Sequence, residues 1–310
     1  MSNQIEYDEI VVCLFDGDFS LGIAGLANSL AKQNFKGLIN VGYRGKLPPW
    51  LNQLKNIGDN NYYLTNEIII HFKEVFTNMH LGYYKPFFIK DTFKDYPSTS
   101  KFYYFDADII ISAPWDIFST WLNEGVCLCL DNSYHFIPHN HPWRKDWIKF
   151  APTQELNLNE SSLYLNSGFI AIERASVALI ERWIYYTEKY IEMGGNINGF
   201  DKAPYSSWKG DQDLLNAAVT ISDEIQINAM GKEAMGFSLP ATLMLHAIGI
   251  IKPWNKNFIL YLIKYGQKPN ASDKAYFTHC KFIIKVFSPF TFRINKINLS
   301  VATFLGRFLG

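Results

Sequence analysis

Asp106 and Asp108 are the residues whose type and spacing point most directly to chemistry. They follow the apolar run 102–105 and precede a second apolar run, 109–111. An apolar run of this length that stops at polar residues predicts a buried strand. At the end of a strand, two carboxylates separated by one residue can converge on one octahedral cation and leave room for water and phosphate oxygens. A solvated turn has the same pattern, so the pair needs support from elsewhere in the chain.

That support comes from residues 246–254, which read His-Ala-Ile-Gly-Ile-Ile-Lys-Pro-Trp. Taken alone, His246 is also compatible with a buried core histidine. Together with Asp106 and Asp108, however, the block is typical of the metal and diphosphate machinery of a sugar-nucleotide enzyme.

The elements that would position these residues alternate between strands and helices. Strands are predicted over 10–15, 38–41, 102–105, 126–130 and 169–172. Helices are predicted over 20–33, 78–93, 114–122, 176–192 and from the 210–213 block to 219. This alternation predicts an α/β domain whose central sheet is mostly parallel and flanked by helices. Ligands of such sheets bind at the carboxyl ends of the strands, where Asp16, Asp106 and Asp131 stand.

Residues 134–163 form a long irregular stretch rich in His, Pro, Trp and Asn. Long segments of this kind in compact domains are often binding loops or lids. His135, His139 and His141 are compatible with a zinc site, but no fourth ligand is evident, and an acceptor loop or plain surface fits better. Trp143 and Trp147, with Trp208 further on, would either stack on sugars or pin the loops.

Composition limits the function classes. The chain has 310 residues, 48% of them hydrophobic, and a formal net charge of zero, so nothing indicates nucleic-acid binding. Its four cysteines, Cys13, Cys127, Cys129 and Cys280, form no disulfide framework. The first residues are polar and acidic, and no apolar run reaches the length of a membrane span. We therefore expect a cytoplasmic protein.

The neutral total hides a basic end. From residue 274 onward the chain has no acidic residue and six basic ones, Lys274, Lys281, Lys285, Arg293, Lys296 and Arg307, interleaved with eight aromatics. Cations among aromatics suit a segment at an anionic membrane surface; a helix docked on the protein body is the alternative. We divide the chain into a catalytic domain, 1–273, and a basic, aromatic C-terminal segment, 274–310, peripheral on the inner face of the membrane.

Five blocks in order give the chain a family resemblance. They are Asp16-x-Asp18-Phe19, Asp106-x-Asp108, residues 166–168 (Asn-Ser-Gly), residues 210–213 (Gly-Asp-Gln-Asp) and the block 246–254. Their order and spacing over residues 10–254 resemble the retaining glycosyltransferases of the glycogenin and bacterial lipopolysaccharide galactosyltransferase type. The resemblance implies the GT-A fold, a single α/β sheet that binds a nucleotide-sugar, here with a C-terminal extension.

The resemblance also implies a metal and phosphate site. Asp106 and Asp108 would hold Mn²⁺, or Mg²⁺ in its place, and Asp106 would also lie near the donor sugar or ribose. His246 would complete the metal site, because imidazole suits Mn²⁺ among divalent cations. Lys252 would pair with the diphosphate, and Gly249 would let the backbone approach it closely.

On the nucleoside side, Asp16 and Asp18 would contact the uracil and ribose of the donor. The family more often has Asn at the position of Asp18. Phe19 stands where a Tyr usually stacks near the base. Lys85 falls where the family carries a basic residue near the sugar and phosphate, although this match is loose.

Asn166, Asp211 and Gln212 would contact the donor sugar. Retention of configuration then allows two routes. One is a double displacement with Asp211 or Gln212 near the anomeric carbon; the other is a front-face substitution in which the leaving phosphate takes the acceptor proton. Because a glutamine is a poor nucleophile, we favour the front-face route.

The expected function is transfer of a hexose from a UDP-sugar to a glycan of a bacterial surface polysaccharide or to a lipid-linked oligosaccharide. Two other readings stay open: an inverting transferase or nucleotidyltransferase of the same broad fold, and a non-catalytic protein that binds nucleotide-sugars. A nucleotidyltransferase normally has a basic, Gly-rich loop after the first strand, whereas this chain has the acidic segment 16–18 there.

Overall fold

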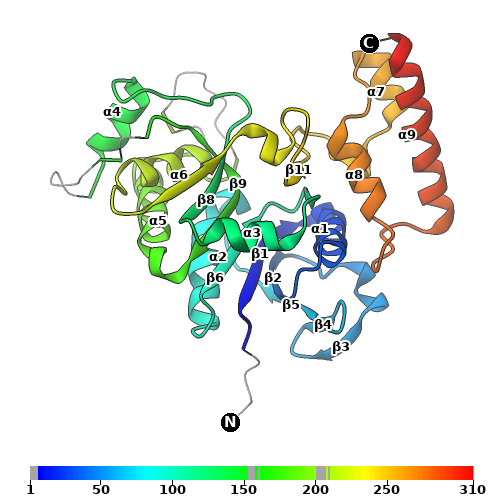
Figure 1. Cartoon of the computed structure of the whole chain (residues 1–310), viewed down its shortest axis with the longest axis horizontal. Helices are drawn as coiled ribbons and strands as arrows, with labels where there is room; N and C mark the ends of the chain where they lie inside the picture. Colours follow the sequence, from blue (N-terminus) through cyan, green and yellow to red (C-terminus); the bar gives the residue numbers. More distant parts are fainter. Residues whose placement is uncertain (1–5, 153–157, 160, 200–206, 209, 310) are drawn as a thin grey trace.

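The computed structural model describes residues 6–152, 158–159, 161–199, 207–208 and 210–309. At its centre is a nine-stranded sheet of order β10-β8-β9-β6-β1-β2-β5-β4-β3 (Figure 1). Its strands are β1 Glu9–Asp16, β2 Gly37–Arg44, β3 Lys55–Gly58, β4 Asn61–Tyr63, β5 Ile68–Glu74, β6 Lys101–Phe105, β8 Val126–Leu130, β9 Leu165–Glu173 and β10 Ile227–Met230. β4 and β9 run against the other strands of this sheet, which confirms the expected mainly parallel α/β architecture.

Alternate residues of the first strand enter two separate cores. Val11, Cys13 and Phe15 of β1 belong to the core beneath α1 (Ser20–Lys32) and α3 (Trp115–Leu122). Ile10 and its even-numbered neighbours in β1 belong to the core beneath α2 (Leu81–Asp95), α5 (Val177–Glu192) and α6 (Asp211–Thr220). Side chains alternate between the faces of a strand, so a strand covered on both faces must be apolar throughout.

A second, two-stranded sheet joins distant parts of the sequence. β7 (Ile109–Ile111) pairs antiparallel with β11 (Met244–His246), and Ile109 lies opposite His246. The strand that follows the Asp pair is thus hydrogen-bonded to the strand that ends at the histidine. This pairing brings the two chemically informative blocks together.

The C-terminal helices form a unit beside α1: α7 (Phe258–Tyr265), α8 (Ala271–His279) and α9 (Pro289–Leu309) (Figure 1). The side-chain amide of Asn28 in α1 donates to the carbonyls of His279 and Ile284, at 2.7 and 2.8 Å. The expected boundary between residues 273 and 274 falls inside α8, which packs on α1. The division into a catalytic and a C-terminal part remains a proposal, and we move its boundary to the start of α7.

The long irregular stretch is only partly irregular, because α4 (Pro142–Lys149) lies within it. The ring Nδ1 of His141 accepts the backbone N–H of Trp143, which caps the helix. Trp143, Trp147 and Trp208 are buried, so they pin this region and present little surface to a sugar. Residues 153–157 and 160 of the stretch lie outside the described residues.

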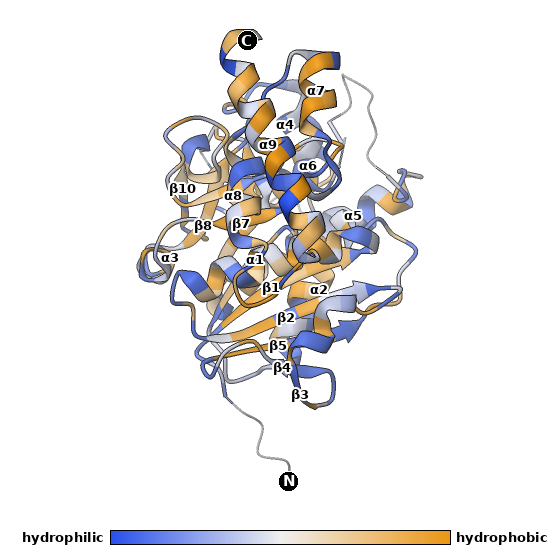
Figure 2. Ribbon diagram, turned by 90° about the vertical axis from the view of Figure 1, so that its right-hand side faces the viewer, coloured by the Kyte–Doolittle hydropathy of each residue, from blue (hydrophilic) through white to orange (hydrophobic). Residues whose placement is uncertain are grey.

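No helix within the described residues is both long and apolar enough to cross a bilayer. Hydropathy colouring shows apolar strands at the centre and mixed helices at the surface (Figure 2).

Candidate functional site

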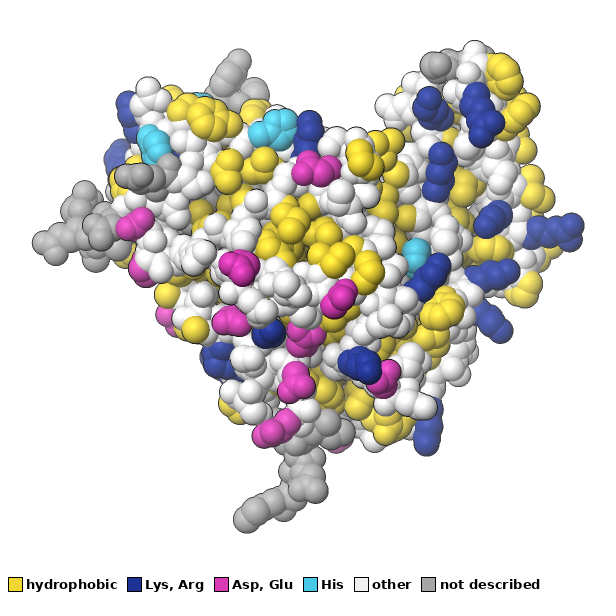
Figure 3. Space-filling model, viewed as in Figure 1, with side chains coloured by type: hydrophobic (Ala, Val, Ile, Leu, Met, Phe, Trp, Pro, Cys, Tyr) yellow, Lys and Arg dark blue, Asp and Glu magenta, His cyan; other side chains and the backbone are white. Residues whose placement is uncertain are grey.

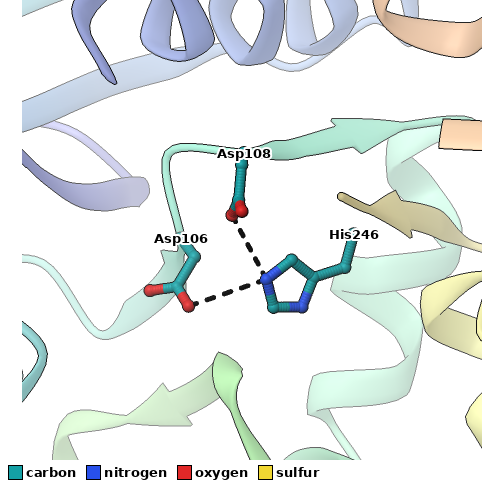
Figure 4. A group of neighbouring side chains, drawn as sticks. All are labelled: Asp106, Asp108 and His246. Carbon is teal, nitrogen blue, oxygen red and sulfur yellow. Dashed lines mark ion pairs between the residues drawn. The ribbon is translucent and has the colours of Figure 1, made fainter. Parts of the chain in front are cut away.

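Asp106, Asp108 and His246 come together at the carboxyl edge of the sheet (Figure 4). The imidazole Nε2 lies 3.2 Å from Asp108 Oδ1 and 3.8 Å from Asp106 Oδ2. One ligand atom from each residue lies within 4.8 Å of the other two. Among the described residues this is the one group of His, Cys, Asp and Glu with spacing suited to a metal, so His135, His139 and His141 form no such group there.

Lys252 holds Asp108 from the other side. Its Nζ lies 2.5 Å from Asp108 Oδ2 and donates to the carbonyl of Ala247 at 2.9 Å. Burial favours a raised pKa for the Asp108 carboxyl, but His246 and Lys252 outweigh it and hold that pKa well below its usual range. Asp108 is therefore an anion at neutral pH, as a metal ligand must be.

A buried lysine links the Asp pair to the more distant sugar-binding candidates. Lys85, 5% exposed, lies 2.9 Å from Asp106 Oδ1 and 2.8 Å from Asp211 Oδ2. Burial works to lower the pKa of Lys85, but the two carboxylates prevail and raise it above its ordinary value. The Tyr104 hydroxyl donates to Asp106 at 3.0 Å and holds this carboxylate in place from the strand itself.

The donor set suits a hard or borderline divalent cation. The carboxylates of Asp106, Asp108 and Asp211 outnumber the ammonium groups of Lys85 and Lys252 by three to two, which leaves a net negative charge. Two oxygen donors and one imidazole match the ligands that Mn²⁺ and Mg²⁺ accept, with imidazole favouring Mn²⁺. Asp106, Asp108 and His246 would hold the ion.

The imidazole sits in a space that a side chain at Gly168 would fill. A Cβ at Gly168 would lie 2.6 Å from His246 Cε1. The buried Nδ1 of His246 has no hydrogen-bond partner within the described part of the chain. Packing against β9 therefore orients this ring, in place of the usual second hydrogen bond of a metal-binding histidine.

A cavity of about 330 Å³ opens beside this group, within the roughly 300–1,000 Å³ of small-molecule sites. Most predicted site residues line it, namely Asp16, Phe19, Lys85, Asp106, Asp108, His246, Gly249 and Lys252. Gly249 has φ 115°, a conformation that favours glycine. Asp16, one of the residues that line the cavity, forms an ion pair with Arg44 at 2.5 Å.

Asp18 lies elsewhere. Its carboxylate accepts the indole N–H of Trp254 at 3.3 Å and also the side-chain amide of Asn255. Asp18 is absent from the residues that line the cavity. In this structure it joins the start of α1 to the turn that follows Lys252.

Asn166, Asp211 and Gln212 form a network next to the cavity. The Asn166 amide donates to Gln212 Oε1 at 3.0 Å and to Asp131 Oδ1 at 3.1 Å. The Ser167 hydroxyl donates to Asp211 Oδ2 at 2.8 Å. Lys85 connects this network to the Asp pair.

Gly22 of α1 lets three segments meet. A Cβ at Gly22 would lie 2.2 Å from the backbone oxygen of Ala107, between the two metal-ligand candidates, and 2.7 Å from the Trp254 ring. Only a glycine admits the metal-binding turn and the lysine-bearing turn this close to the helix. Gly22 does not stand out in the sequence, because the residues that require a glycine at this position lie far along the chain.

Three further residues of the site, Arg44, His80 and Tyr104, were not predicted from the sequence. Tyr104 could have been found, because it lies in the predicted strand two residues before Asp106, and positions two apart along an extended chain point to the same side. His80 lines the cavity as the cap of α2, where its Nδ1 accepts the Gly82 N–H at 3.1 Å. Arg44 ends β2, opposite Asp16 in the parallel register, which only the strand order reveals.

The sheet order, the antiparallel β7–β11 pair and the acidic carboxyl edge together define a GT-A-like glycosyltransferase fold. A solved structure of this fold is the WbbM bifunctional glycosyltransferase in its apo form, with a TM-score of 0.55 and 15% identity. The match covers 96% of this chain and 52% of that one, so this chain spans about half the length of that protein. At such identity the match shows the fold alone. No family model matches the chain, and neither does any curated protein.

Proposed function

We propose that this chain is a metal-dependent glycosyltransferase that moves a hexose from a UDP-sugar to a glycan or glycolipid acceptor. The observation that carries the proposal is the group formed by Asp106, Asp108 and His246 beside a cavity at the carboxyl edge of a GT-A-like sheet. The acceptor we propose is a bacterial surface polysaccharide or a lipid-linked oligosaccharide. All four cysteines are free and buried, which supports a reducing, cytoplasmic location.

The lysines supply the positive charge that the reaction needs from the protein. Cleavage of the sugar–phosphate bond leaves negative charge on the departing nucleoside diphosphate. A divalent cation bound by the two Asp and the His would neutralise part of that charge. Lys252 now binds Asp108, and with donor present we infer that its Nζ turns to the diphosphate oxygens. Lys85 lies between Asp106 and Asp211, where its positive charge offsets the repulsion between the two carboxylates and holds both in place.

We propose retention by front-face substitution. The acceptor oxygen bonds to the anomeric carbon as the bond from that carbon to the phosphate oxygen breaks, and the acceptor proton passes to the phosphate. Asp211 Oδ2 already accepts from Lys85 and Ser167, and Gln212 Oε1 accepts from Asn166. Oxygens held by these donors are weakened as nucleophiles, which supports this route over a double displacement. A trapped glycosyl–Asp211 adduct would contradict it, and an inverted product would indicate the inverting alternative.

The test is release of UDP from a panel of UDP-sugars, with Mn²⁺ and after removal of metal by EDTA. We expect turnover of one donor that requires metal and falls by about 10²–10³-fold or more in Asp108→Asn, by analogy with loss of one charge-stabilising group. Asp223→Asn is the matched control, since Asp223 is an exposed carboxylate away from the site. Absence of both turnover and a thermal shift with any UDP-sugar plus Mn²⁺ would refute the proposal and favour a non-catalytic binding protein.

A further inference from the structure

The outer face of α9 carries an apolar stripe. Its residues recur every three or four positions, as one face of a helix requires. They are 38–75% exposed: Phe290, Ile294, Ile297, Val301, Phe304 and Phe308. The opposite face carries the buried Leu299 and Ala302, which pack in the cluster shared with α7. The helix therefore shows an apolar face to the body and another to the solvent.

α7 extends this exposed apolar surface. It packs along α9, and its residues Leu260, Ile263 and Tyr265 are 57%, 72% and 53% exposed. α7 is mostly apolar, and apolar and polar residues alternate along α9 (Figure 2). Many large apolar side chains exposed on two neighbouring helices of a folded protein mark an interaction site.

The charge of the same unit identifies the partner. From residue 258 onward the chain has eight basic residues and one acidic residue, Asp273. Asp273 is buried and bound to Lys256 at 2.8 Å. Lys and Arg side chains gather over this lobe, whereas the acidic side chains in the same view lie over the rest of the molecule (Figure 3). This charge favours a partner of negative charge.

Two of these lysines share one cavity at the start of α9. Lys281 and Lys285 are paired across an antiparallel bridge and line a cavity of about 220 Å³ with Phe287, Pro289 and Phe292. Lys281 Nζ lies 4.8 Å from the Phe292 ring centre. No ion pair joins either lysine to an acidic group among the described residues. Two like charges at one cavity repel each other, and an anion between them, such as a phosphate group, would offset that repulsion.

We propose that α7 and α9 form a docking surface for an anionic phospholipid bilayer. The apolar stripe enters the boundary between headgroups and acyl chains, and Lys281 and Lys285 bind a headgroup phosphate. With the transferase activity proposed above, this docking favours a lipid-linked acceptor; that consequence rests on the proposed function, whereas the docking itself does not.

The experiment is co-sedimentation of the full chain with vesicles of phosphatidylcholine alone or mixed with phosphatidylglycerol. We expect binding to the mixed vesicles only, weakened by salt. The double substitutions Phe304→Glu/Phe308→Glu and Lys281→Ala/Lys285→Ala should each weaken binding by about tenfold or more. The first removes apolar area from the stripe and adds negative charge. The second removes two cations, each of which contributes about 1 kcal/mol near an anionic surface. The controls Ile117→Glu and Lys46→Ala change exposed side chains elsewhere and should bind as the wild type does.

Equal binding to both kinds of vesicle, or unchanged binding by the two double variants, would overturn the proposal. So would a dimer in solution that Phe304→Glu/Phe308→Glu dissociates, because the stripe would then join two copies of this chain. Asp108→Asn should bind vesicles as the wild type does. Failure of the docking proposal and failure of the transferase proposal are thus separate results.

Discussion

The lysines of the site at the sheet edge and the lysines of the C-terminal unit differ in burial and in pairing. Lys85 and Lys252 are largely buried, and each lies within 2.9 Å of a carboxylate. Lys281 and Lys285 are exposed and lack an acidic partner within the described residues. Burial makes an unpaired charge costly, whereas water stabilises an exposed one. Lysines paired with carboxylates are therefore expected in a site that is assembled within the protein. Lysines without an acidic partner are expected on a surface that binds a partner from outside.

Removal of a buried cation should have the largest effect. Lys85→Met leaves Asp106 and Asp211 buried without their shared partner, so we expect a loss of about 3–5 kcal/mol in the free energy of unfolding. Lys285→Met, the matched change in the C-terminal unit, should stay within about 0.5 kcal/mol. Denaturant unfolding measures both. Similar losses in the two variants would remove the contrast between the two regions.

Substitutions on the buried face and on the exposed face of the C-terminal unit should differ almost as much in their effect on the free energy of unfolding. Phe277 is 2% exposed and Phe304 is 57% exposed. We expect Phe277→Ala to cost about 3–5 kcal/mol of unfolding free energy through lost burial and a cavity. Phe304→Ala should change it by no more than about 0.5 kcal/mol. A large cost at Phe304 would mean that the stripe supports the fold, against its role as a docking surface.

Gly22→Ala tests how closely the site depends on its supporting helix. The new Cβ would push against the backbone between Asp106 and Asp108, and a displacement of about 1 Å can cost about 10²-fold in rate. We expect this loss in UDP release together with a higher Mn²⁺ requirement. Gly25→Ala, one turn along α1, meets side-chain atoms of Ile110 and Tyr276 at 3.0–3.1 Å and no backbone atom of the turn between the Asp pair, so it should retain most activity. Equal activity in both variants would contradict the positioning role of Gly22.

Asp18→Asn should have the smallest effect. Asp18 is exposed and accepts from Trp254 and Asn255, so we expect a cost of about 0.5–1.5 kcal/mol for the weakened hydrogen bonds. A loosened turn after Lys252 should raise the KM for the donor a few-fold and leave kcat nearly unchanged. A large fall in kcat would instead place Asp18 in contact with the reacting donor.

Local sequence was sufficient for much of the fold. The strand over 126–130 and the helices over 114–122 and 176–192 appear within one residue of their predicted ends. Each of the two helices buries one apolar face, and the strand is a short apolar run that is buried on both faces, so all three patterns are clear in the sequence. β3, β4 and β5 were not predicted. β3 and β4 have only four and three residues and carry little pattern of their own, whereas the seven residues of β5 begin with an apolar run, 68–70, that could have been recognised. α4 was missed because its eight residues hold one Pro, two Trp and four charged residues in an order without clear helical periodicity.

The sequence by itself determined which groups are present: two carboxylates after an apolar run, a distant histidine and lysine, and a basic, aromatic end. Residue type and short-range spacing carry that information. Tertiary structure decided which of them meet. Pairing of β7 with β11 set His246 beside Asp108, the fold placed Lys85 between Asp106 and Asp211, and it drew Asp18 away to Trp254. Such contacts join residues far apart in the chain, and their energies depend on burial, which no local pattern specifies.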